Sequence, residues 1–284
     1  MPERIKIGGI GFVSAWPLVE GLASEAGVDL RLEAPSALAP LLKAGEVDAA
    51  LVPSVDYYRL AADSGERARA PAGRAPSRFV ALDVAAIGSR GPVGSARLFG
   101  YAEAETIRRV LLDPASRTES VMARLLLARP APVQPHFVLP EEIGPHPARP
   151  PDAELVVGDA ALGAARPAAQ WEWDLGEEWE GRVHRPFVYA FWVARSDGPL
   201  GRLVEVLSAA RDRGLAAREA IAARAAAERG IPPAAARRHL CHQVEYGFGP
   251  KARLGLTRFY EMAAEEGLAP EGCRLALAPG AAGP

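Results

Sequence analysis

Hydroxyl-bearing residues and one arginine follow the ends of several short apolar runs in this sequence. In a parallel sheet, ligands gather beyond the carboxyl ends of the strands, where helix N-termini present unpaired N–H groups. The segments with this placement are Phe12-Val13-Ser14, Pro53-Ser54, Ser116-Arg117-Thr118 and Gly158-Asp159. Because they offer hydrogen-bond donors and a guanidinium, the pattern favours the binding of a small carboxylate.

Each of these residues also has a purely structural interpretation. The residues that are good helix N-caps, worth about 1 kcal/mol each without any ligand, are Ser54, Ser116, Thr118 and Asp159. Arg117 beside a helix N-terminus suits a carboxylate, but it suits an ion pair between two lobes equally well. Ligand binding is favoured when these residues are taken together, because all of the strand ends that carry them are expected to face the same cleft.

The first part of the chain alternates between strand and helix patterns. The expected strands cover residues 4–10, 28–33, 48–52 and 79–87. Pro35-Ser36 is expected to open a helix over 37–44 that ends at Gly45, and the charged, proline-rich stretch 63–77 is expected to be a surface loop. Strands and helices joined by short connections are typical of a parallel sheet.

A second strand-and-helix unit follows, and then a helical carboxyl-terminal part. The expected strands are 110–112, 133–139 and 155–157, with a helix over 120–128 and a proline-rich loop over 140–152. Apolar residues at helical spacing predict helices within 199–229, and further helices are expected over 232–241 and 251–266. The small-residue tail after Leu277 is expected to be disordered.

Two strand-like apolar runs flank this second unit. Residues 91–99 and 186–195 each carry a proline near the start, a position that a strand tolerates. They predict a two-lobed α/β protein in which the chain crosses between lobes twice, with lobe 1 formed by residues 1–91 and 191–284 and lobe 2 by 92–190. Ligands favour such interfaces, so Gly91 and Ser95 at the first crossing join the candidate site. Ser95 is otherwise an ordinary strand residue.

Composition excludes several classes of function. A net charge of −2 gives no support for nucleic-acid or membrane-surface binding. The amino end lacks the pattern of a secretory signal, no run is apolar enough to span a membrane, and Cys241 and Cys273 form no CxxC pair, so a cytoplasmic protein is expected. The sequence has no nucleotide-binding glycine motif, no GxSxG elbow and no recognisable metal-ligand set, so neither a cofactor nor a metal is expected.

The motifs, taken in order, resemble a known family. They are FVSAWPL at 12–18, PSALAPLLKAGEVDAALVPS at 35–54, GPVGSARLF at 91–99, SRT at 116–118, GDAAL at 158–162, DLGEEW at 174–179 and PFVYAFWVAR at 186–195, with HLCHQVEYGFGPKARLGLTRFY at 239–260. This order is similar to that of the chorismate dehydratases of the futalosine route to menaquinone. The similarity extends over nearly the whole chain.

The resemblance implies a type II periplasmic-binding-protein-like fold and a reaction in which chorismate loses water to give 3-[(1-carboxyvinyl)oxy]benzoate. It also implies that Ser95 lies in the active site and that Ser116, Arg117 and Thr118 form a ligand loop. Two positions depart from the family pattern. Ser14 stands where the family usually has asparagine, and Glu119 follows the SRT motif where the family usually has serine.

A mechanism can be written as a hypothesis. Arg117 and helix N-termini would hold the two carboxylates, while Ser95 and nearby backbone N–H groups stabilise charge that grows on the ring carboxylate. Ser14 is placed near the departing hydroxyl. No protein base is evident, so the enolpyruvyl carboxylate of the substrate itself is the proposed proton acceptor.

Two other functions remain open from the sequence. One is a non-catalytic protein that binds a small carboxylate on the same fold, which the changes at Ser14 and Glu119 favour. The other is the sister enzyme, 1,4-dihydroxy-6-naphthoate synthase, although no cleft histidine supports it. The sequence does not determine the oligomeric state.

Overall fold

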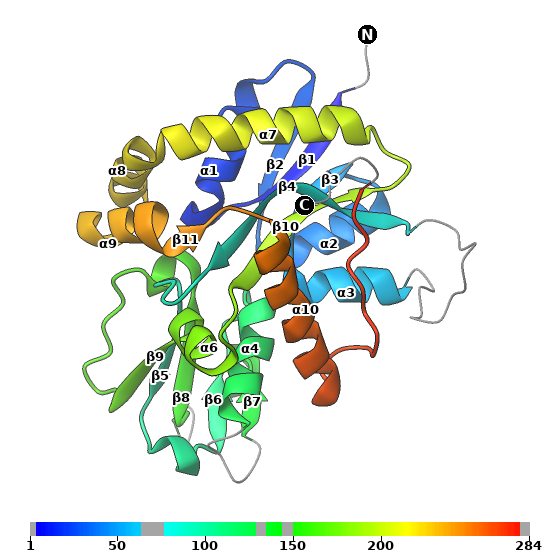
Figure 1. The fold of residues 1–284 in the computed structure, drawn as a ribbon. Helices are drawn as coiled ribbons and strands as arrows, with labels where there is room; N and C mark the ends of the chain where they lie inside the picture. The colour runs from blue at the N-terminus through cyan, green and yellow to red at the C-terminus, as the bar shows by residue number, and fades with distance from the viewer. Residues whose placement is uncertain (1–3, 64–76, 129–134, 144–149, 279–284) are drawn as a thin grey trace.

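The computed structural model describes residues 4–63, 77–128, 135–143 and 150–278 (Figure 1). Most of the expected loop 63–77, the start of the expected strand 133–139, part of the expected loop 140–152 and most of the tail after Leu277 lie outside these ranges. Two sheets, each covered by helices, form the two lobes, one above the other in Figure 1.

The sheet of lobe 1 has six strands in the order β11-β4-β10-β3-β1-β2. Their bounds are β1 Ile5–Ile10, β2 Val28–Glu33, β3 Ala49–Pro53, β4 Phe79–Ser89, β10 Phe187–Arg195 and β11 Val244–Glu245. Strands β1, β2 and β3 are parallel, as the short connections predicted, but β10 runs antiparallel to both β3 and β4. The sheet is therefore mixed rather than wholly parallel.

Strand β10 lies in the middle of this sheet because its sequence is apolar on both faces. Its side chains from Phe187 to Ala194 are all buried. Trp192 and Phe191 are fully enclosed, and Phe191 stacks on Phe248 with ring centroids 4.9 Å apart. A strand that is apolar on both faces is stable only where helices cover both sides of the sheet.

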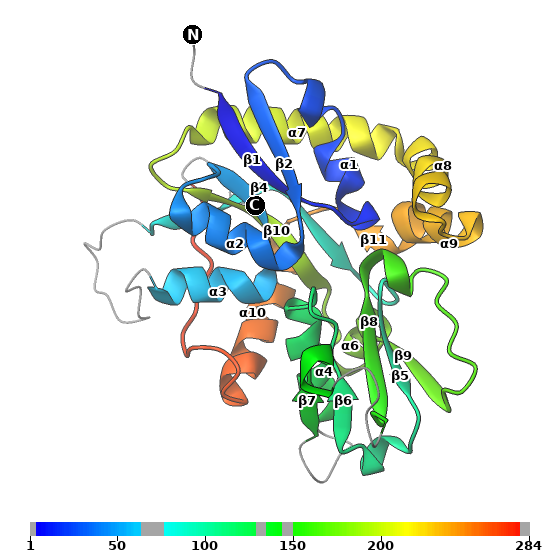
Figure 2. The ribbon, with the colours of Figure 1, turned by 180° about the vertical axis from the view of Figure 1, so that it is seen from behind.

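Helices cover both faces of the lobe 1 sheet. Their bounds are α1 Trp16–Val19, α2 Pro35–Ala44, α3 Ser54–Asp63, α7 Leu200–Ala216, α8 Arg218–Arg229, α9 Pro233–Arg238 and α10 Pro250–Glu265. Helix α7 crosses the near face in Figure 1, whereas α2 and α3 lie in front in the reverse view of Figure 2. Helix α2 ends as predicted, with Gly45 in the left-handed conformation at φ 76°.

The sheet of lobe 2 has five strands in the order β7-β6-β8-β5-β9. Their bounds are β5 Ala96–Gly100, β6 Arg109–Leu111, β7 His136–Val138, β8 Ala153–Val157 and β9 Trp171–Asp174, and the helices are α4 Thr118–Leu127, α5 Pro140–Ile143 and α6 Leu175–Val183. Short 3-10 turns cover Val13–Ala15, Leu22–Ser24, Ala104–Thr106 and Gly158–Ala161, and a π-helix covers His239–Gln243.

Several predicted elements need correction. The run 91–99 becomes a strand only from Ala96 onward, because the segment before it forms the crossing between lobes. The expected loop 140–152 begins with the short helix α5, and the helix predicted over 232–241 is interrupted where α9 passes into the π-helix. Strands β9 and β11 and helix α6 were not predicted.

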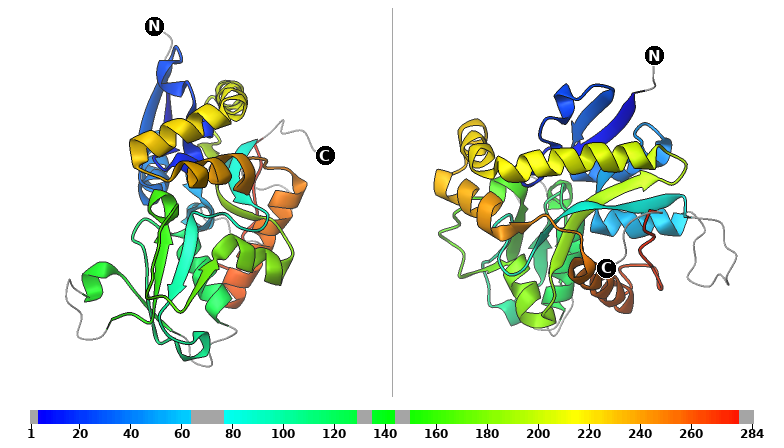
Figure 3. Two further views of the ribbon diagram at one scale, coloured as in Figure 1. Left: turned by 90° about the vertical axis from the view of Figure 1, so that its left-hand side faces the viewer. Right: turned by 45° about the horizontal axis from the view of Figure 1, so that its top comes forward.

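The first crossing is held by a carboxylate. Asp174 accepts hydrogen bonds from the backbone N–H groups of Val93 at 2.9 Å and Gly94 at 2.6 Å, and it also caps α6 through Gly176. The two crossings lie side by side, since Phe187 at the start of β10 pairs with Ser89 at the end of β4. Figure 3 shows the two lobes from two further directions. Strand β10 pairs with β4 from Phe187 onward, so the expected boundary between residues 190 and 191 falls inside β10.

A buried histidine holds the same crossing from lobe 1. His239 Nδ1 lies 2.7 Å from the carbonyl oxygen of Val93. Burial lowers the pKa of His239 to about 4, against the opposing effect of this hydrogen bond, so the ring is neutral at pH 7. Since a carbonyl only accepts, Nδ1 carries the proton. Together, Asp174 and His239 fix the backbone that leads to Ser95.

No helix in the described part of the chain is long and apolar enough to cross a membrane.

Candidate functional site

A cavity lies between the two lobes, where the two crossings meet the ends of the strands. About 510 Å³ of space free of protein atoms lies within it, a figure that extends outward into open solvent. Its lining residues are Ile10, Phe12, Ser14, Pro35, Pro53, Ile87, Ser95, Ala115, Arg117, Thr118, Glu119, Gly158, Tyr189 and Ala190. Both lobes therefore contribute to its wall.

Three helices begin at the cavity wall. Pro35 is the first residue of α2, Pro53 directly precedes α3, and Thr118 is the first residue of α4. Each helix has ten residues, and the aligned peptide dipoles give each N-terminus partial positive charge, although Val55 N–H of α3 is already bonded to Thr118 Oγ1. This convergence favours an anionic ligand, as the strand-end pattern in the sequence predicted.

Two serine hydroxyls at the wall have no hydrogen-bond partner among the described residues. Ser95 is held through its backbone, because its carbonyl accepts a bond from Gly158 N–H at 2.8 Å. Ser14 is held in the same way, since its carbonyl accepts a bond from the Tyr246 hydroxyl at 3.0 Å. Rigid backbones with free hydroxyls leave both side chains able to donate to a ligand.

The lobes touch at one end of the cavity through Phe12 and Gly158. Gly158 has φ 65°, and a Cβ there would lie 2.9 Å from the Phe12 ring, so both the conformation and the contact require glycine. Next to it, the Asp159 carboxylate accepts a hydrogen bond from Val13 N–H at 2.9 Å and pairs with Arg229 at 3.7 Å. Asp159 thus joins the lobes and does not line the cavity.

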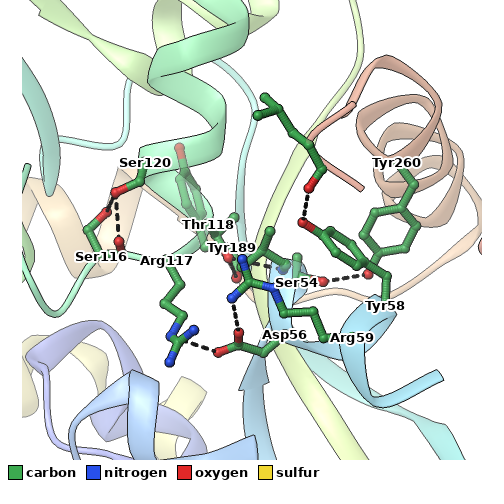
Figure 4. Close-up of polar contacts among 12 residues, drawn as sticks. Ser54, Asp56, Tyr58, Arg59, Ser116, Arg117, Thr118, Ser120, Tyr189 and Tyr260 are labelled. Carbon is green, nitrogen blue, oxygen red and sulfur yellow. Dashed lines mark hydrogen bonds and ion pairs between the residues drawn. The ribbon is translucent and has the colours of Figure 1, made fainter. Parts of the chain in front are cut away.

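Arg117 forms the ion pair between lobes that its structural interpretation predicted, while its binding of a carboxylate stays a prediction. It lines the cavity, and its Nε also lies 3.6 Å from Oδ2 of Asp56 on α3 in the opposite lobe (Figure 4). Asp56 is buried and also pairs with Arg59 at 3.2 Å. Burial raises the pKa of Asp56, and the two arginines oppose this shift.

The hydroxyl groups of Thr118 and Ser54 are used within the protein. Thr118 Oγ1 donates to the carbonyl of Tyr189 at 3.2 Å and accepts from Val55 N–H at 3.3 Å, which ties α4 to lobe 1 (Figure 4). Ser54 Oγ donates to the carbonyl of Val188 at 2.6 Å and is fully buried. Ser54 is therefore corrected from a ligand residue to an anchor of α3 on β10.

Among the lining residues of the cavity, Glu119 is the one whose side chain carries a carboxyl group. It occupies the first turn of α4, and its Oε2 accepts a hydrogen bond from Ser116 Oγ at 3.2 Å. Ser120 Oγ donates in turn to the carbonyl of Ser116 at 2.7 Å. Burial raises the pKa of Glu119 to about 7, with smaller contributions from Asp113 and Asp56, while bonds from its own backbone and from Ser116 lower it. Near neutral pH this carboxyl can either hold or release a proton.

The remaining predicted residues lie beside the cavity and not on its wall. Gly91 has φ 83° and supplies the turn of the first crossing. Ser116 lies behind Glu119 and orients its carboxyl group. The predicted residues that do line the cavity are Phe12, Ser14, Pro53, Ser95, Arg117, Thr118 and Gly158.

Sequence reasoning missed Tyr189 as a residue of this site. Its hydroxyl lies 3.2 Å from Ser89 Oγ, and burial raises its pKa well above 10. The one available signal was a tyrosine within an otherwise apolar strand, because a buried phenol needs a polar partner. Among the described residues, no group of three His, Cys, Asp or Glu side chains is placed to hold a metal ion.

Comparison with known proteins agrees with this architecture. Residues 70–265 match the family model described as menaquinone biosynthesis. The chain is 31% identical over 274 residues to a chorismate dehydratase of Thermus thermophilus, and the match covers 86% of this chain and 94% of the relative.

Solved structures agree on the fold. A crystal structure of a protein from Archaeoglobus fulgidus superposes with a TM-score of 0.66 at 16% identity, covering 93% of this chain and 98% of that one. The periplasmic aliphatic sulphonate binding protein of Escherichia coli gives a TM-score of 0.61 at 15% identity, covering 96% and 95%. The chain therefore has the two-lobed fold of periplasmic binding proteins.

Proposed function

Because the chain belongs to the menaquinone biosynthesis family and is similar over most of its length to a chorismate dehydratase, we propose that it removes water from chorismate to give 3-[(1-carboxyvinyl)oxy]benzoate. It would then be a hydro-lyase of the cytoplasm acting on a small dicarboxylate. The observation that carries the proposal is a cavity in which free hydroxyls and one guanidinium meet three helix N-termini.

Binding of a dianion suits this electrostatic arrangement. Each helix N-terminus contributes about 0.3–1 kcal/mol toward an anion, and a hydrogen bond between charged groups contributes about 1.5–3 kcal/mol. Arg117 is paired with Asp56 at 3.6 Å, which is longer than a hydrogen bond, so a carboxylate at closer range competes well for it. The proposed complex therefore places one carboxylate of chorismate at Arg117.

The chemical step builds negative charge on the ring carboxylate. When the C3–H bond breaks, its electron pair is delocalised through the ring diene onto that carboxylate. Loss of the C4 hydroxyl then gives an aromatic ring. Ser95, whose hydroxyl has no partner among the described residues, is the proposed donor to the ring carboxylate, and Ser14 is proposed to contact the C4 oxygen.

The proposed proton acceptor is the enolpyruvyl carboxylate of the substrate. The ether oxygen and one vinyl carbon separate this carboxylate from C3, so a cavity that fixes the rotation of the enolpyruvyl group gives the carboxylate a high effective concentration at the C3 proton. The narrow space between Phe12, Gly158 and the crossing is suited to this restriction.

The test is to incubate the purified protein with chorismate and separate the products by chromatography. We expect an aromatic product with the retention time and mass of 3-[(1-carboxyvinyl)oxy]benzoate, formed in proportion to protein concentration. Ser95→Ala protein purified in the same way serves as the control for contaminating activity.

Binding of chorismate without product would support a non-catalytic carboxylate-binding protein instead, an alternative favoured by Ser14 at the position where the family usually has asparagine. If the protein neither binds chorismate nor forms the product, both of these functions are contradicted. The sister enzyme activity, 1,4-dihydroxy-6-naphthoate synthase, is then the one to assay.

A further inference from the structure

The carboxyl group of Glu119 has no role in the reaction as described so far. It lines the cavity together with Ser14, Ser95 and Arg117, and among the described lining residues it is the carboxylate. The residue as a whole is half-buried, and it lines the cavity. A buried carboxyl group beside the binding place of a dianion is costly unless it is protonated or used.

We propose that Glu119 is the general acid of the reaction, donating its proton to the C4 oxygen of chorismate as the carbon–oxygen bond breaks. This inference rests on the proposed dehydration. The C3 proton passes to the enolpyruvyl carboxylate, the C4–O bond breaks with its electron pair on oxygen, and the Glu119 proton completes the water molecule. The enolpyruvyl carboxyl then returns one proton to Glu119 through solvent as the product leaves, so atoms and charges balance.

The charges around Glu119 favour the protonated form of its carboxyl group, and therefore a role as general acid and not as general base. Asp113 precedes α4, Asp56 belongs to α3, and Tyr189 on β10 also lines the cavity. Arg117 is the neighbouring cation, and it is engaged by Asp56 and, in the proposed complex, by substrate. A bound dianion adds two more negative charges, so the Glu119 carboxyl is neutral when the substrate is in place.

The other lining groups are poor proton donors. Ser14, Ser95 and Thr118 carry hydroxyls of high pKa, and the Tyr189 phenol has a pKa raised well above 10 by burial. General-acid catalysis is most effective when the pKa of the donor is close to the working pH. Among the described lining residues, Glu119 is the one with a pKa close to neutral pH, since its pKa is raised to about 7.

The hydrogen bond from Ser116 is the means of positioning this acid. Ser116 Oγ donates to Oε2 at 3.2 Å, and the backbone N–H of Glu119 also bonds to this carboxyl group, so two donors fix its orientation. Ser120 Oγ in turn donates to the carbonyl of Ser116 at 2.7 Å and lies 3.4 Å from the Ser116 hydroxyl, which holds Ser116 in place (Figure 4).

The test is the pH dependence of chorismate turnover in the wild type and in three variants. For the wild type we expect kcat/KM to fall as pH rises through about 7, because the acid form is lost there. Glu119→Gln should lower kcat by about 100-fold or more and remove this descending limb. Glu105→Gln, which changes an exposed carboxylate of lobe 2, should match the wild type.

Ser116→Ala gives a second readout that does not depend on removing the acid. A hydrogen bond to the ionised form lowers the pKa, so its loss raises the pKa and should move the descending limb to higher pH. The inference is overturned if wild-type turnover has no limb that depends on Glu119, or if Glu119→Gln keeps its activity within about threefold. An activity that rises through about pH 7 and loses that limb in Glu119→Gln would assign the base instead. Failure of the wild type to convert chorismate contradicts the proposed function itself.

Discussion

Ser95→Ala is expected to lower kcat for chorismate by about 100- to 1,000-fold while changing KM by no more than about threefold. The ring carboxylate carries more charge in the transition state than in the bound substrate. A hydroxyl that donates to it therefore stabilises the transition state more than the ground state. Steady-state kinetics measures both constants.

The backbone around Ser95 is fixed independently of its side chain. Its carbonyl is bonded to Gly158 N–H, and the preceding residues are held by Asp174 and His239. The alanine variant should therefore fold normally, which circular dichroism and the melting temperature check. Ser208→Ala, a half-buried serine on α7 away from the cavity, is the matched control. An unchanged kcat in Ser95→Ala would remove this hydroxyl from the mechanism.

Arg117→Met is expected to raise the dissociation constant for chorismate by about 100-fold, the equivalent of about 2.7 kcal/mol. The variant keeps the apolar stem of the side chain and loses the guanidinium, so it removes a charge-assisted hydrogen bond to the substrate. Equilibrium dialysis with the Ser95→Ala background, in which turnover is slow, measures binding without product formation.

Arg59 is the matched control for this prediction. It also pairs with Asp56, at 3.2 Å, but does not line the cavity. Arg59→Met should therefore leave the dissociation constant within about threefold of the parent. Equal losses in the two variants would show that the guanidinium acts through Asp56 and the lobe contact, contrary to direct binding of a carboxylate.

Much of the architecture was predictable because hydrophobic patterns depend on local sequence. The apolar run that forms β10 and the helix ended by Gly45 were both placed correctly, since burial on both faces and a left-handed residue leave clear marks in a sequence. Strand β9 was missed because its alternating pattern covers only the four residues Trp171–Asp174, at the edge of the sheet.

The site was predictable to the level of segments and not of side chains. Ser14, Ser54, Ser95 and Ser116 all follow or begin strands or helices, but only the structure separates the free hydroxyls from the used ones. Ser54 donates to Val188, more than a hundred residues away in the chain, and no local pattern reports such a partner.

The role of Glu119 could not be predicted from the sequence either. In the sequence it stands out as a departure from the family pattern and as a negative charge next to a dianion site. In the structure, burial raises its pKa to about 7, which turns an apparent obstacle to binding into a proton donor. Burial depends on the lobe contact, and a single loop sequence does not encode it.

The most direct test of this account is a crystal structure of the Ser95→Ala protein soaked with chorismate. The account predicts chorismate in the cavity between the lobes, with one carboxylate bonded to Arg117 and the C4 oxygen within hydrogen-bonding distance of Glu119. Chorismate bound elsewhere on the protein, or in this cavity with both carboxylates away from Arg117 and the helix N-termini, would contradict it.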